Sequence, residues 1–269
     1  MKLKYNLKVA SIVLATLFFT SVFSQEAEKL YHEKYSKLSL VIQPSKLYGY
    51  TIFDTNSPTV EFNETFSAQF GIVYNFAQYK NFNFKTGVIA KMFYPTYDLI
   101  ISNDDIDAGY DYTNVLTDVN ATQQFVISEV LKVEYIKPIS NKINFVTNIG
   151  ISLDLRTEGI LEKSIKINVN DYNTGNLKTI FVGENKNPQL TGSLDLSIGA
   201  NLKTKFGLFQ LEVFRNSQLL NYAETGTFKF VNLKNTPDKT FDYIVKGNYK
   251  GLSLTFSPKK KWLVRKSKR

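Results

Sequence analysis

The stretch LTGSLDLSIGANL, residues 190–202, alternates apolar and polar side chains. The apolar parity holds Leu190, Leu194, Leu196, Ile198, Ala200 and Leu202. The polar parity holds Thr191, Ser193, Asp195, Ser197, Gly199 and Asn201. Alternation with period two is typical of a β-strand whose two faces meet different surroundings. Strands of soluble proteins usually have only about 5–6 residues. A strand as long as residues 190–202 is therefore unusual for a soluble β protein.

The same pattern occurs along the rest of the chain. Clear alternation marks residues 66–76, 81–94 and 143–155. Weaker alternation marks 38–42, 122–137, 206–215 and 241–256. Glu129 interrupts the apolar parity of 122–137 and predicts a β-bulge there. The sequence therefore predicts an all-β protein with eight antiparallel strands.

Connector lengths predict how these strands are joined. Three joints are short, around residues 78–80, 138–142 and 203–205, and four are long, roughly 45–64, 95–121, 157–189 and 216–240. Strict alternation of short and long connectors is typical of an up-and-down transmembrane barrel with short periplasmic turns and long surface loops. Both termini then lie on the periplasmic side.

Two of the long connectors contain β-like sequence of their own. Residues 165–181 alternate on either side of a turn-like segment, 172–176, and residues 227–233 precede a second turn signal. We expect hairpins that extend above the membrane. If these segments join the barrel, the strand count becomes ten.

Alternation alone leaves a soluble lipocalin-like barrel as an alternative, in which the apolar face points inward. Three features favour a membrane barrel, in which the apolar face of each strand contacts lipid on the outside. The polar faces are small and weakly charged. Glycines lie on those faces, at Gly71, Gly87, Gly150 and Gly199. Aromatic residues gather at the strand ends, as in membrane-barrel girdles. We assign to the periplasmic rim Phe76, Tyr79, Phe82, Phe84, Tyr135, Phe145, Phe206, Phe209 and Phe256, and to the outer rim Phe66, Phe93, Tyr94, Phe125 and Phe214.

The ends of the chain carry targeting and charge signals. Residues 1–24 have the order of a cleaved secretory signal peptide: lysines, an apolar run and a short cleavage region. The expected organisation is a signal at 1–24, a short periplasmic segment at 25–34, the barrel at 35–257 and a basic tail at 258–269. The barrel with its N-terminal segment holds 23 basic and 24 acidic residues. Because the excess of basic residues lies outside the body, a nucleic-acid partner is not expected.

The chain resembles the small outer-membrane β-barrel proteins of Bacteroidota, a group of PorT-like and OmpA-type eight-stranded barrels. The resemblance rests on the signal ending Phe23-Ser24-Gln25, the eight-strand pattern and the final strand GLSLTF, 251–256. Such barrels often end at the last aromatic residue, whereas this chain continues for 13 residues past Phe256. The resemblance implies an outer-membrane location in a Gram-negative bacterium, and PorT-like members are linked to protein secretion.

Candidate chemistry is sparse. The chain has no Cys and one His, His32, which precedes the barrel and cannot join a Ser-His-acid site at the outer rim. In the second long connector, Asn103, Asp105 and Asp107 have the spacing of calcium-loop ligands, but Asn114 stands where a bidentate Glu is needed. We expect a solvated acidic loop. The prediction is no catalytic residue, no metal site and no cofactor.

Charges on the predicted lumen faces are more informative. They are Lys85, Lys91, Lys132, Glu134, Asp154, Arg156 and Asp195. The interior of an eight-stranded barrel is just wide enough to be filled by side chains, so these charges must pair. We expect a filled lumen, with a narrow solute channel as the alternative.

The sequence thus predicts a monomeric, non-enzymatic outer-membrane barrel with a structural, adhesive or secretion-accessory role. Its expected partners are outer-membrane lipids and lipopolysaccharide. The basic tail, 258–269, offers a further contact with a periplasmic or secretion-machinery partner.

Overall fold

The computed structural model describes residues 34–53, 58–101, 115–120, 124–156, 163–170, 177–186, 190–233 and 237–260. Eight antiparallel strands form a closed barrel, because the first pairs with the last. They are β1 (Leu38–Ile52), β3 (Thr65–Tyr79), β4 (Phe82–Phe93), β7 (Gln124–Pro138), β8 (Ile143–Arg156), β11 (Leu190–Lys203), β12 (Gly207–Leu220) and β14 (Lys239–Pro258). The predicted fold class is confirmed. The chain enters and leaves at the same end, where Tyr35 and Lys259 form an isolated bridge.

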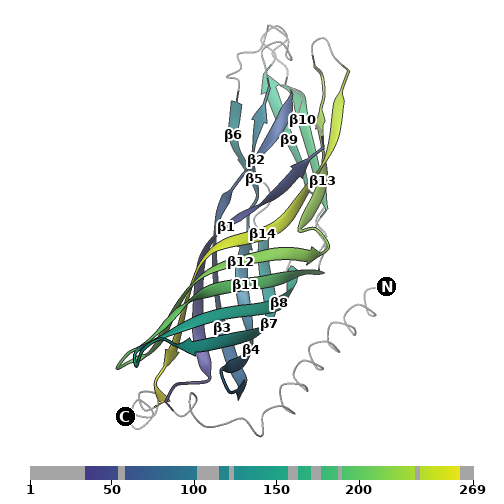
Figure 1. The fold of residues 1–269 in the computed structure, drawn as a ribbon. Helices are drawn as coiled ribbons and strands as arrows, with labels where there is room; N and C mark the ends of the chain where they lie inside the picture. Colours follow the sequence, from purple (N-terminus) through teal and green to yellow (C-terminus); the bar gives the residue numbers. More distant parts are fainter. Residues whose placement is uncertain are drawn as a thin grey trace, which may run out of the picture.

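The long connectors carry six further strands instead of open loops (Figure 1). Strands β2 (Thr59–Asn63), β5 (Thr96–Ile100) and β6 (Val115–Asn120) form a separate sheet. Strands β9 (Lys163–Asn170), β10 (Leu177–Lys186) and β13 (Glu224–Phe230) pair in series with the first part of β14. We call these six strands, with residues 239–245 of β14, the cap. The two expected hairpins are present, but they extend the structure beyond the barrel and do not widen it to ten strands.

Apolar side chains face outward on all eight barrel strands, on the parity that the alternation predicts. Examples with exposed side chains are Leu38, Leu40, Ile42, Phe66, Phe70, Ile72, Val88, Phe125, Ile127, Leu131, Ile149, Ile151, Leu196, Ile198, Leu211, Val213, Leu252 and Leu254. The intervening positions are mostly polar and buried, among them Gln69, Ser152 and Asn201. We call the outward-facing set the apolar band.

Three sequence predictions are wrong in detail. The register of β7 with both neighbours is unbroken at Glu129, so no bulge occurs; Glu129 simply pairs across the sheet with Val88 and Leu153. Phe93 and Phe214, assigned to the outer aromatic girdle, are buried at 1% and 7% exposure. Both lie where the barrel interior changes from polar to apolar beneath the cap, so an inward aromatic ring is favoured there.

The glycines on the lumen face allow close contact between strands. A Cβ atom added at Gly199 would lie 2.0 Å from the carbonyl oxygen of Leu211 and 2.6 Å from the Cα of Glu212. At Gly71 it would lie 2.2 Å from the carbonyl oxygen of Val88. These positions therefore exclude any side chain, which explains why glycine stands on the polar face of these strands.

Several predictions concern residues outside the described part of the chain. They are the signal peptide, His32, the acidic loop around Asp105, the hairpin tip at 172–176 and the tail beyond Lys260. Within the described residues, no helix has the length and apolar composition of a membrane span.

Candidate functional site

The lumen of the barrel is organised around Glu134 of β7. This side chain is 1% exposed. Its carboxylate forms an ion pair with Lys85 of β4 and accepts hydrogen bonds from Asn83 Nδ2, at 2.7 Å, and from Gln210 Nε2, at 2.9 Å. Gln210 belongs to β12, so these contacts cross the barrel interior. A buried charge is tolerable only when such partners replace its hydration.

Two further ion pairs fill the lumen. Lys91 Nζ lies 3.0 Å from Asp154 Oδ1, which also accepts a hydrogen bond from Ser128 Oγ at 2.6 Å. Lys132 Nζ lies 3.8 Å from Asp195 Oδ2. The prediction that the lumen charges pair is thus confirmed for six residues, Lys85, Lys91, Lys132, Glu134, Asp154 and Asp195.

The seventh predicted lumen charge, Arg156, lies at the end of the barrel, as the last residue of β8. Its guanidinium carbon lies 4.3 Å from the centroid of the Phe93 ring, at the outer end of β8. This cation–π contact places Arg156 between the polar lumen and the buried hydrophobic cluster to which Phe93 belongs.

One lumen carboxylate, Glu212 of β12, is not among the charges predicted from the sequence. It is 5% exposed and accepts hydrogen bonds from Asn148 Nδ2 and Ser197 Oγ. The signal was available, because Glu212 alternates with the outward Leu211 and Val213. The parity change near Phe214 concealed it.

A cavity of about 30 Å³ lies between these groups. Its lining mixes apolar side chains with the charged residues Lys85, Lys132, Asp195 and Glu212. This volume holds only about two water molecules. The geometry therefore favours a filled lumen over a wide solute path.

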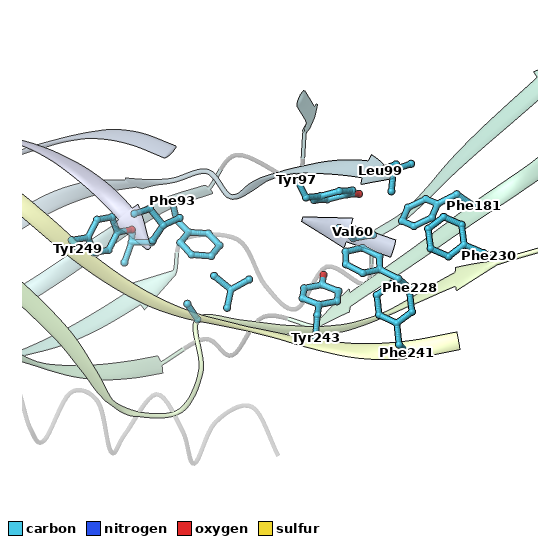
Figure 2. Packing of buried hydrophobic residues seen from close by; sticks show 14 of the residues in the cluster. Val60, Phe93, Tyr97, Leu99, Phe181, Phe228, Phe230, Phe241, Tyr243 and Tyr249 are labelled. Atoms are coloured by element: carbon cyan, nitrogen blue, oxygen red, sulfur yellow. The ribbon is translucent and has the colours of Figure 1, made fainter. Parts of the chain in front are cut away.

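The outer end of the lumen is covered by a cluster of buried aromatic residues from the cap (Figure 2). At its centre the ring of Phe228 stacks on Tyr243, with centroids 4.2 Å apart, and lies 5.0 Å from Tyr97 and 5.3 Å from Phe181. These four residues come from four different strands, β13, β14, β5 and β10. The cluster thus joins the two sheets of the cap into one packed unit.

One carboxylate lies inside this aromatic cluster. Glu224 is fully buried and accepts a hydrogen bond from the Tyr243 hydroxyl at 2.7 Å. Desolvation, reinforced by the nearby negative charge of Glu224, raises the pKa values of Tyr97 and Tyr243. Both phenols therefore remain neutral over the physiological pH range.

Among the described residues, no group of three or more His, Cys, Asp or Glu side chains is placed to hold a metal ion. The lumen lysines Lys85, Lys91 and Lys132 are each already paired with a carboxylate. The arrangement can stabilise a closed barrel and present a rigid cap, and those are the properties on which a function must be built.

No protein-family model matches the sequence, and a search of curated proteins finds no match. Among solved structures, the chain is similar to the outer membrane protein OprG from Pseudomonas aeruginosa. The alignment covers 84% of this chain and 98% of that one, with 8% identity and a TM-score of 0.43.

Proposed function

We propose that this protein is a non-enzymatic outer-membrane β-barrel that anchors the cap at the bacterial surface. The observation that carries the proposal is the apolar band on all eight strands around a lumen of paired charges. A soluble barrel would bury its apolar face, because an exposed apolar surface of this extent drives aggregation in water. The apolar outer surface of this barrel is suited to contact with the hydrocarbon core of a membrane.

The cap is then the part that meets partners. It stands at the end of the barrel opposite the entry and exit of the chain (Figure 1). If the predicted signal peptide delivers the N-terminus to the periplasm, the cap faces the outside of the cell. An adhesive or secretion-accessory role fits a rigid, surface-exposed cap on a closed barrel. The resemblance to PorT-like barrels of Bacteroidota points in the same direction.

The first test is gel mobility of the detergent-extracted outer-membrane fraction, with and without boiling. A closed membrane barrel should migrate faster before boiling than after it. Recovery in the soluble fraction with no shift would overturn the membrane proposal and direct attention to a soluble barrel.

The second test separates an anchor from a channel. The purified barrel in a planar bilayer should give no stable conductance steps, because its lumen holds three ion pairs and only a small cavity. Reproducible steps of defined size would favour a small-solute channel. The lumen double variant Lys85→Met/Glu134→Gln would then be expected to alter those steps.

A further inference from the structure

Three cations lie side by side on the outer surface of the barrel, just beyond the apolar band. Lys46 of β1 is directly opposite Lys250 of β14, and Lys250 is directly opposite Arg215 of β12. All three side chains face outward and are exposed. We call Lys46, Lys250 and Arg215 the cation row.

The position of the cation row follows from the strand sequences. On β14 the outward residues before Lys250, counted from the periplasmic end, are Phe256, Leu254 and Leu252. On β12, Phe209, Leu211 and Val213 precede Arg215 in the same way. The row therefore sits where the apolar band ends and the cap begins, at the height of lipid headgroups in the outer leaflet.

Such an arrangement is unfavourable without an anion. Directly opposed side chains in an antiparallel pair have Cβ atoms only about 4.5–5.5 Å apart, and like charges at that separation destabilise the sheet. Glu64 offsets part of the repulsion: it lies 3.6 Å from Lys46 Nζ and pairs closely with Lys250. One carboxylate against three cations leaves a net positive charge of two.

An aromatic ring lies beside two members of the row. The ring of Tyr48 lies 4.9 Å from Lys250 Nζ and 5.7 Å from the Arg215 guanidinium carbon, which holds both cations beside one aromatic face. Arg215 forms no ion pair with an acidic residue in the described part of the chain. An Arg guanidinium and two ammonium groups together suit phosphate oxygens, through charge-assisted hydrogen bonds.

We infer that the cation row binds the phosphate group of a phosphorylated glycolipid in the outer leaflet. This inference rests on the proposed membrane location. The phosphate oxygens accept hydrogen bonds from Arg215, Lys250 and Lys46, while the acyl chains lie along the apolar band below. Glu64 competes with the phosphate for the two lysines.

The test uses the full-length mature protein in detergent, after a heat-modifiable band has verified that the barrel is folded. Native mass spectrometry then counts the retained lipid during titration with bisphosphorylated lipid A. The triple variant Lys46→Gln/Arg215→Gln/Lys250→Gln should bind at least about tenfold more weakly. A matched triple variant at the opposite end of the barrel, Lys80→Gln/Lys137→Gln/Lys142→Gln, loses the same charge and should bind within about twofold of the wild type.

Two further arms identify the ligand. Dephosphorylated lipid A should bind the wild-type protein as weakly as the triple variant binds the intact lipid. Millimolar inorganic phosphate should fail to displace the lipid if the acyl chains contribute, whereas full displacement would show a site for free phosphate and overturn the lipid assignment. Glu64→Gln should strengthen lipid binding, because it frees two lysines.

Equal binding by the wild type and the cation-row variant would refute the inference while leaving the membrane barrel intact. Absence of the heat-modifiable band in the wild type would instead refute the proposed function itself. The two failures are therefore distinguishable.

Discussion

Substitution of Glu134 should be among the most damaging single changes in the lumen. Glu134→Gln keeps the shape of the side chain but removes the charge that compensates Lys85, whose side chain is 13% exposed. It also places an amide nitrogen among donors that need an acceptor, namely Asn83 and Gln210. Breaking a buried ion pair by removing one partner costs about 3–5 kcal/mol. We expect a loss of this size in the free energy of unfolding.

The assay is reversible unfolding in guanidinium, in detergent or lipid, with the gel-mobility shift as readout. A double-mutant cycle isolates the pair: Lys85→Met alone should also destabilise the barrel, because it leaves Glu134 uncompensated. The double variant should recover about 2 kcal/mol or more of the summed loss. Lys229→Gln, at the exposed Lys229–Asp238 ion pair, is the control and should leave barrel stability nearly unchanged.

A Glu134→Gln variant that loses less than about 1 kcal/mol, the range typical of an exposed pair, would contradict a buried Lys85–Glu134 pair. Strict additivity in the cycle would also contradict it. Either result would mean that water reaches Glu134 freely and that the lumen is more open than the cavity volume indicates.

Three other outcomes follow from the same geometry. Leu211→Arg, in the middle of the apolar band between Phe209 and Val213, should cost about 2–4 kcal/mol in unfolding titrations. Glu129→Leu, which replaces a carboxylate among apolar neighbours, should instead raise stability; the opposite signs would reverse the facing assignment. Phe228→Ala should destabilise the cap by about 3–5 kcal/mol and expose it to proteolysis while the heat-modifiable band persists. Because the pKa values of Tyr97 and Tyr243 are raised, the folded cap retains two protons that the unfolded chain releases above about pH 10. Cap stability should be constant below that pH and fall above it by up to about 1.4 kcal/mol per pH unit for each tyrosine, as tyrosinate absorbance and cap proteolysis measured together would show.

Period-two alternation was sufficient to predict the barrel, because the pleat forces successive side chains to opposite faces. The same parity placed Lys91, Asp154 and Asp195 in the lumen before any contact was known. That these charges form pairs could be predicted, because an unpaired charge is unfavourable in a narrow interior. Which lysine meets which carboxylate depends on barrel closure, which local sequence does not encode.

The cap was harder to predict. Its central residues, Tyr97, Phe181, Phe228 and Tyr243, come from parts of the chain that are distant in sequence. Three of them lie in strands of 5, 10 and 7 residues, and Tyr243 lies near the start of the 20-residue strand β14. Phe93 and Phe214 were misplaced for a related reason. A rule that assigns aromatic residues at strand ends to the lipid interface fails where a second packed unit stands above the barrel.

The pairing of strand β14 determines how a mechanical force applied to the cap reaches the barrel. Its first residues, Lys239 to Val245, pair with β13, and the part from Tyr249 to Phe256 is bonded on both sides to β1 and β12. A pull on the cap is therefore delivered along the axis of one continuous strand into two flanking ladders. Such a load shears many hydrogen bonds at once and does not peel them one by one. One of the connections between the cap and the barrel is thus the strand that closes the barrel, so a force applied along β14 would have to shear both of its ladders and open the wall.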